Sequence, residues 1–229
     1  MARLSSLNRR YKDIFLMHSL IGFLESPVPL VSADMLDTLY TWYLSSGDEA
    51  EISRKILSTA TTLSILCDRI KMYSSLDSTN KRSVQFILPV ISSHYESHAK
   101  SNPQNVPFTI DLQYLSTGIF NCINNNSSSV LLAEYLHCLY CLEKSFQSDC
   151  LVQMDLLLPL ADHIVNEDNE YVLGYFFTIL NIIKHSFEEE ILQLLQFPNM
   201  LEKLFFLQQI TTNTIFALSC QNLQEFCIQ

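Results

Sequence analysis

The chain has 229 residues, of which 48% are apolar and only 17% are charged, and its formal net charge is −10. It contains four glycines. This scarcity argues against a glycine-rich phosphate loop, a dinucleotide-binding fingerprint and most hairpin-rich sheets, because all of them need residues with positive φ at fixed places. Residues 83–229 carry fifteen acidic and four basic side chains, which disfavours nucleic acid as a partner and favours a basic protein segment.

The first part of the chain is predicted to form amphipathic helices. The first helix ends near Glu25, before a break caused by two prolines. Ser32 is the predicted N-cap of the second helix, and Gly47 ends it. The acidic residues that follow, beginning with Asp48, suit the N-terminus of a third helix. A fourth helix is expected over residues 81–98 and contains a proline.

The rest of the chain is also predicted to be helical, within a single domain that spans residues 1–229. Residues 100–108 are the most linker-like stretch and the best candidate for an internal boundary. Ser186 and Glu189 match a capping box at the start of one helix. Beyond a helix that Thr109 caps and another around Leu132–Leu142, helices are expected over residues 151–165, 169–186, 187–197, 199–210 and 213–226.

The C-terminal third contains an internal repeat. A shift of 39 residues aligns Leu156–Pro159 with Leu195–Pro198, and Phe177 with Phe216. The helix-breaking proline and the aromatic helical segment therefore keep the same distance, as one repeated supersecondary unit requires. The best repeat units are residues 151–189 and 190–229.

Residues 151–226 resemble armadillo/HEAT repeats: an apolar helix around a proline, a short acidic loop, and a helix with an aromatic residue four positions before Asn. This resemblance implies a right-handed α-solenoid of about 9–11 helices. In importin-α-like armadillo proteins the last pattern is W-x-x-x-N, in which Asn binds the backbone of an extended peptide and Trp shapes a side-chain pocket. Phe177 and Asn181 match with Phe in place of Trp, whereas Cys220 replaces Asn after Phe216. The resemblance is a stronger indication of architecture than of nuclear-signal recognition.

No catalytic motif is recognisable in the sequence. His137, Cys138 and Cys141 include a C-x-x-C pair, but a structural zinc site needs about four ligands. The surrounding leucines indicate a packed helix, so these thiols are interpreted as core residues. His94 and His98 are interpreted as part of a solvated helix end. We therefore expect no enzyme activity, no metal and no cofactor.

Composition also bears on the compartment and on the membrane. The seven cysteines are odd in number, which favours a reducing, intracellular location in the cytoplasm or nucleus. No apolar stretch approaches the roughly 18 residues that a membrane-spanning helix needs, so no membrane association is expected.

The low charge leaves apolar surface for a partner to cover. The sequence therefore predicts a non-catalytic scaffold or adaptor that binds a peptide or helical segment of another protein, or a second copy of itself, through a groove or its apolar C-terminal end. The predicted contact residues are Phe177, Asn181, Phe216, Cys220, Leu223 and Phe226. For Asn181 a role inside the fold is an alternative. The alternative function is a globular helical-bundle regulator, or an enzyme without a recognisable catalytic motif.

Overall fold

The structure is a computed structural model, and every regular element in its described residues is helical, with no strand among them. The predicted all-α class is therefore confirmed. The described residues are 16–57, 59, 62, 64–66, 87–93, 96, 129–145 and 152–228. They fall into two compact units: unit 1 holds those between 16 and 91, and unit 2 holds those between 92 and 228. The possible boundary at residues 100–108, the helix expected from Thr109, and His94 and His98 lie outside the described residues.

In unit 1, a helical stretch over residues 16–24 precedes α2 (Pro29–Leu44) and α3 (Asp48–Leu57). The prediction that Ser32 caps α2 is wrong. The helix begins earlier, at Pro29, because proline's fixed φ and missing N–H suit the first helical turn. Ser32 instead lies inside the helix, where its buried hydroxyl donates to the carbonyl of Leu24 at 2.6 Å.

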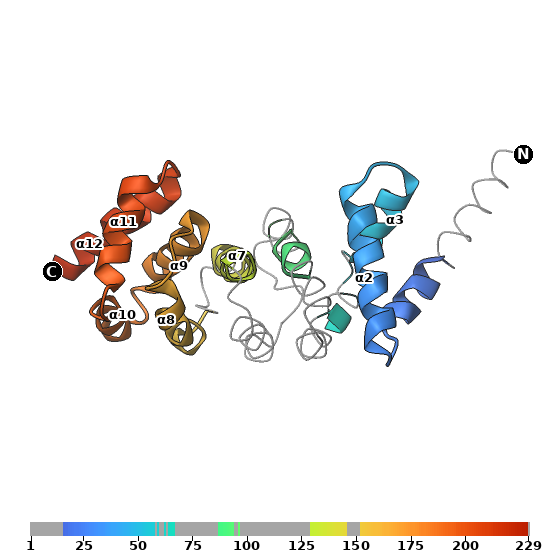
Figure 1. The fold of residues 1–229 in the computed structure, drawn as a ribbon, viewed down its shortest axis with the longest axis horizontal. Coiled ribbons are helices and arrows are strands. Elements are labelled where there is room, and N and C mark those ends of the chain that lie inside the picture. The colour runs from blue at the N-terminus through green and yellow to red at the C-terminus, as the bar shows by residue number, and fades with distance from the viewer. Residues whose placement is uncertain are drawn as a thin grey trace, which may run out of the picture. The chain divides into compact units, whose positions relative to one another are not determined.

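The turn between α2 and α3 depends on Gly47, whose φ of 108° lies in the region that glycine adopts most easily. The two helices then pack against each other (Figure 1). Leu36, Leu39 and Ile56 are fully buried. Ser53 adds a polar link, since its buried hydroxyl donates to the carbonyl of Leu39. The predicted third helix, with Asp48 in its first turn, is confirmed over α3.

In unit 2, α7 is followed by two short 3-10 helices (η1, η2) and five further α-helices, and the apolar positions of α7 predicted that helix correctly. The elements are α7 (Ser129–Ser145), η1 (Met154–Leu156), η2 (Leu158–Leu160), α8 (Ala161–Ile164), α9 (Glu170–Ile183), α10 (Glu188–Leu195), α11 (Met200–Ile210) and α12 (Thr214–Ile228). The single helix predicted over residues 151–165 is wrong. Pro159, in the first turn of η2, lacks the N–H that would continue the preceding turn, so the segment breaks into η1, η2 and α8.

The predicted capping box at the start of α10 is also wrong. The N-cap residue is Phe187, and no side chain caps the helix there. The amide of Ser186 donates to the carbonyl of Ile183 at 2.9 Å, which closes the turn after α9. Three glutamates, Glu188 to Glu190, complement the helix dipole in the first turn instead.

Helices α7 and α9 pack side by side in the same direction. At their N-terminal ends, the hydroxyl of Ser129 donates to Glu167, just before α9, at 2.7 Å. Further along both helices, the ring centroids of Tyr140 and Tyr175 lie 5.5 Å apart. Because the starts meet and the later turns meet, the two helices run parallel.

Helix α12 also packs against α9. Thr211, just before α12, donates its hydroxyl to Glu170 at 2.6 Å, so the N-terminal ends are tied together. Near the C-terminal ends, Lys184 Nζ lies 5.9 Å from the centre of the Phe226 ring. Within the described part of unit 2, α9 is therefore the middle helix between two parallel neighbours.

The 39-residue register aligns residues that occupy different turns. Phe216 lies in the first turn of α12, whereas Phe177 lies two turns into α9. The connection from α9 to α12 contains two full helices, α10 and α11, while α9 is preceded by η1, η2 and the short α8. The first residues of α7, α9 and α12 are 129, 170 and 214, so successive starts are 41 and 44 residues apart. Both separations are longer than the 39-residue shift that aligned the sequence.

Within the described residues, none of the helices combines the length and the apolar character needed to traverse a lipid bilayer.

Candidate functional site

A cavity of about 390 Å³ lies between α7 and the start of α9 in unit 2 and opens to solvent. Its lining is mainly apolar and aromatic with a few polar side chains, and none of these described lining residues is a lysine or arginine. We call this cavity the α7–α9 groove. The lining residues are Val130, Ala133, Glu134, His137, Asn169, Tyr171 and Tyr175.

Helical spacing places these side chains on facing surfaces. On α7, Val130, Glu134 and His137 are three or four residues apart and so share one face. On α9, Tyr171 and Tyr175 are four apart and share the opposing face. The two helices therefore each contribute one face to the groove.

The start of α9 is fixed by a side-chain cap. Asn169 is the N-cap residue, and its Oδ1 accepts hydrogen bonds from the amides of Tyr171 at 2.9 Å and Val172 at 3.4 Å. Such a cap satisfies N–H groups that have no partner within the helix. The loop before it is held by Glu167, whose Oε1 accepts from the amides of Asp168 and Asn169, each at 3.0 Å. The groove wall at Tyr171 is thus built on an anchored helix start.

The groove carries a carboxyl group and neutral aromatic surface. Partial burial raises the pKa of Glu134 above its ordinary value, while nearby His137 acts in the opposite direction. Burial raises the pKa of Tyr175 to about 12, so its phenol is neutral at physiological pH. Burial here destabilises the ionised form of the Glu134 carboxyl group, and a cation close to Glu134 would stabilise that form.

Tyr175 is the centre of an aromatic cluster that supports the groove. Its ring lies 4.8 Å from that of His137 and 5.5 Å from that of Tyr140, both on α7. On its other side, Phe216 of α12 meets it edge-to-face at 5.2 Å. Phe216 also meets Tyr171 edge-to-face, at 6.4 Å. One cluster of rings therefore joins the groove wall to α12.

Most of the residues predicted to contact a partner are buried in the core of unit 2. Four of the six are buried: Phe177, Phe216, Cys220 and Leu223. Phe177 packs edge-to-face against Phe176, at 5.5 Å between ring centres. Phe216 lies directly over Gly174. The structure thus places these four side chains in the packing between helices and not in the α7–α9 groove.

The other two predicted residues, Asn181 and Phe226, are partly exposed and lie together between α9 and α12. Asn181 Oδ1 accepts a hydrogen bond from Lys184 Nζ at 3.2 Å, and the same ammonium group lies over the Phe226 ring. The observed contacts of Asn181 are therefore of the internal kind, and partner binding by this pair stays a prediction.

Sequence reasoning missed the groove residues Glu134, Tyr171 and Tyr175. A signal was present, since two tyrosines at helical spacing directly follow a capping Asn169. The aromatic–Asn pattern indicated Phe177 of the same helix instead. Nothing in the sequence indicated that α7 provides the facing wall.

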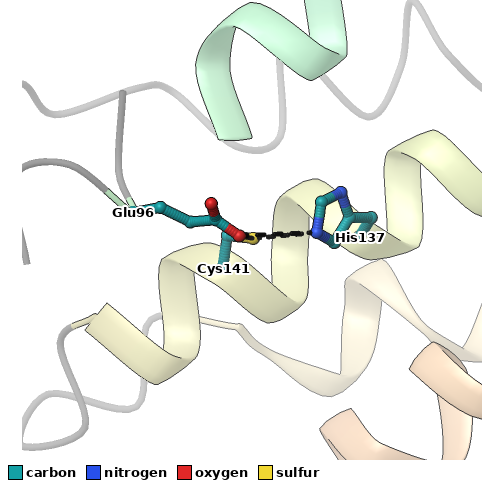
Figure 2. Close-up of side chains that lie close together, drawn as sticks. All are labelled: Glu96, His137 and Cys141. Carbon is teal, nitrogen blue, oxygen red and sulfur yellow. Dashed lines mark hydrogen bonds and ion pairs between the residues drawn. The ribbon is translucent and has the colours of Figure 1, made fainter. Parts of the chain in front are cut away.

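A second cluster adjoins the groove and contains three possible metal ligands, Glu96, His137 and Cys141 (Figure 2). His137 and Cys141 are one turn apart on α7, and Glu96 reaches them from a separate segment of unit 2. Burial raises the pKa of the Cys141 thiol. Cys138 is fully buried, which raises its pKa to about 12. It is not part of the cluster, so the two cysteines of the C-x-x-C pair have different surroundings.

Comparison of the chain with known protein families, with curated proteins and with solved structures finds no match in any of the three.

Proposed function

We propose that the protein is a non-catalytic interaction scaffold or adaptor that binds an extended, basic segment of a partner protein in the α7–α9 groove. The observation that carries the proposal is the groove lining, in which a carboxyl group, an amide and two tyrosines face a cavity whose described walls hold no lysine or arginine. The acidic balance of residues 83–229 supports the same sign of partner.

A lysine or arginine side chain has suitable partners in this groove. Its charged head group would meet the Glu134 carboxylate, and a charge-assisted hydrogen bond of this kind is stronger than a neutral one. The rings of Tyr171 and Tyr175 offer cation–π surface for the same head group. Because Asn169 uses its Oδ1 to cap α9, its NH₂ group is the part suited to donate to a peptide carbonyl.

The parallel packing of α7, α9 and α12 supports an armadillo/HEAT-like, right-handed α-solenoid as the proposed architecture. In an up-and-down helical bundle, helices joined by short loops are antiparallel neighbours. In unit 2, α9 lies between two parallel helices, and shorter elements return the chain between them. Repeat proteins of this kind present successive helices along an extended binding surface.

The proposal is tested by the charge of the peptides that the intact chain binds. The protein is applied to an array of immobilised decapeptides of random sequence, and the best binder is resynthesised with a fluorescent label for anisotropy titration. We expect bound peptides to be enriched in Lys and Arg. Glu134→Gln removes the carboxylate with little change of shape and is expected to weaken binding about tenfold.

Glu225→Gln is the matched control, because it removes the same charge from an exposed position on α12 outside the groove. Its affinity should stay within about twofold of the unmodified protein. Bound peptides without basic enrichment, or equal losses from Glu134→Gln and Glu225→Gln, would overturn the proposal.

A further inference from the structure

We propose that Glu96, His137 and Cys141 form a binding site for a zinc ion. This site is separate from the proposed peptide-binding function, although His137 also lines the α7–α9 groove. The proposal depends on the distances between the donor atoms, on their chemistry and on the elements that hold them.

The three donor atoms are spaced like the corners of one face of a zinc tetrahedron. Cys141 Sγ lies 3.3 Å from His137 Nε2 and 3.5 Å from Glu96 Oε1, and the nitrogen and oxygen are 3.7 Å apart (Figure 2). Zinc bonds are about 2.3 Å long to sulfur and about 2.0–2.1 Å long to nitrogen or oxygen. In tetrahedral geometry, these lengths place sulfur about 3.5 Å from either other donor and nitrogen about 3.4 Å from oxygen. An ion therefore fits after movements of a few tenths of an ångström.

The fold holds this triangle from two sides. His137 and Cys141 are four residues apart on α7, so regular helix geometry alone brings their donors together. The His137 ring also packs against Tyr175, which limits its rotation. Glu96 reaches in from a residue 45 positions earlier in the sequence than Cys141, and its side chain is 52% exposed. A bound ion would consequently link Glu96 to α7.

The donor chemistry favours zinc among the common divalent cations. A thiolate, an imidazole and a carboxylate suit a borderline-soft ion, whereas Mg²⁺ and Ca²⁺ prefer oxygen ligands alone. One thiolate and one carboxylate also balance the charge of a dication. Three protein ligands leave a fourth position for water.

Binding requires the loss of one proton. Without an ion, the Cys141 thiol donates to Glu96 Oε1. When Zn²⁺ binds, the S–H bond breaks, the sulfur keeps the electron pair and forms the Zn–S bond, and the proton passes to solvent. The thiol therefore gives up one proton for each zinc ion bound.

The test uses the intact, reduced chain with Co²⁺ as a spectroscopic probe and Zn²⁺ as competitor. We expect a near-ultraviolet thiolate-to-cobalt charge-transfer band that saturates at one equivalent and disappears when Zn²⁺ is added. Calorimetry of Zn²⁺ binding in two buffers of different ionisation enthalpy should give about one proton released per ion. Cys141→Ser should abolish the band, and Glu96→Gln should weaken Zn²⁺ binding by about 100-fold.

Cys138→Ala is the matched control, since it removes the neighbouring thiol of the same helix and should leave the band intact. If circular dichroism shows that Cys141→Ser does not fold, the exposed Glu96→Gln variant decides the matter. Absence of the band, or a band and affinity unchanged by Glu96→Gln, would overturn the zinc site. Peptide binding that depends on Glu134 would be unaffected by that result.

Discussion

Gly174 allows the Phe216 ring of α12 to lie against the backbone of α9. A Cβ atom at position 174 would come within 2.3 Å of that ring. We therefore predict that Gly174→Ala destabilises the protein by about 1–3 kcal/mol, because overpacking outweighs the higher helix propensity of alanine, which is about 1 kcal/mol. Urea unfolding followed by circular dichroism measures the change.

Gly22→Ala is the control for this prediction. Gly22 is also helical, but a Cβ atom there would meet nothing within 4 Å. The same substitution should raise the stability by about 0.5–1 kcal/mol. If both variants become more stable, the close approach of Phe216 to Gly174 does not restrict the packing of α12.

The two cysteines of α12 are expected to differ in reactivity. Cys220 is fully buried, and burial raises its pKa to about 11, so almost none of it is thiolate at pH 8. Cys227 is exposed. We predict that iodoacetamide modifies Cys227 at least about tenfold faster at pH 8, as measured by mass spectrometry of proteolytic peptides. Modification of Cys220 at an equal rate in the folded protein would contradict its burial.

At the scale of single elements, the cap of α9 supports both the helix and the groove. Asn169→Ala removes the acceptor of two backbone amides and is predicted to cost about 1 kcal/mol of stability. It also removes a groove side chain, so basic peptides should bind more weakly. Thermal unfolding and the anisotropy titration measure the two effects separately.

Asn169→Asp distinguishes the two roles of this residue. Aspartate caps as well as asparagine and adds a negative charge at the helix N-terminus, so stability should be retained. The variant loses the NH₂ donor to a peptide carbonyl, but its carboxylate can accept charge-assisted hydrogen bonds from Lys or Arg, which are the stronger kind, so basic peptides should bind at least as tightly. Loss of stability in the aspartate variant would show that capping is not the main contribution of Asn169.

Apolar periodicity predicted the existence of the helices better than their starts. Leu132 and Leu139 are buried on α7 as their spacing indicated, because burial of one face is what stabilises such a helix. Ser32 and Ser186 have typical capping side chains, yet neither caps a helix. Pro29 starts α2 before Ser32, which shows that a residue type suited to a cap does not decide where the chain begins its turn.

The candidate site depends on contacts that sequence spacing does not contain. Helical spacing predicts that His137 and Cys141 share a face, but it does not predict that Glu96 reaches that face. Likewise, Tyr171 and Tyr175 are neighbours on α9, while their position opposite Glu134 results from the packing of α7 on α9. Faces of helices can thus be predicted from one sequence, whereas the pairs of faces that meet require the fold.

At the scale of the whole molecule, the net charge of −10 should make binding of basic peptides depend on salt. Salt screens attraction between exposed charges, and at about 0.5 M the screening length falls to roughly half its value at 0.1 M. We predict that raising NaCl from about 50 mM to about 500 mM weakens peptide binding roughly tenfold, mainly by slowing association. Stopped-flow anisotropy measures the rate, and an affinity independent of salt would argue for a mainly apolar contact.

Tyr175 links the α7–α9 groove to the C-terminal helix, because its ring contacts His137 on one side and Phe216 on the other. We expect a ligand that restricts the Tyr175 ring to restrict Phe216 of α12 as well, because the two rings pack against each other. If a groove ligand changes the affinity of α12 for a second partner, thermodynamic reciprocity requires that partner to change the affinity of the groove for its ligand by the same factor. Two surfaces on separate helices would in this way become energetically coupled through a single phenol ring.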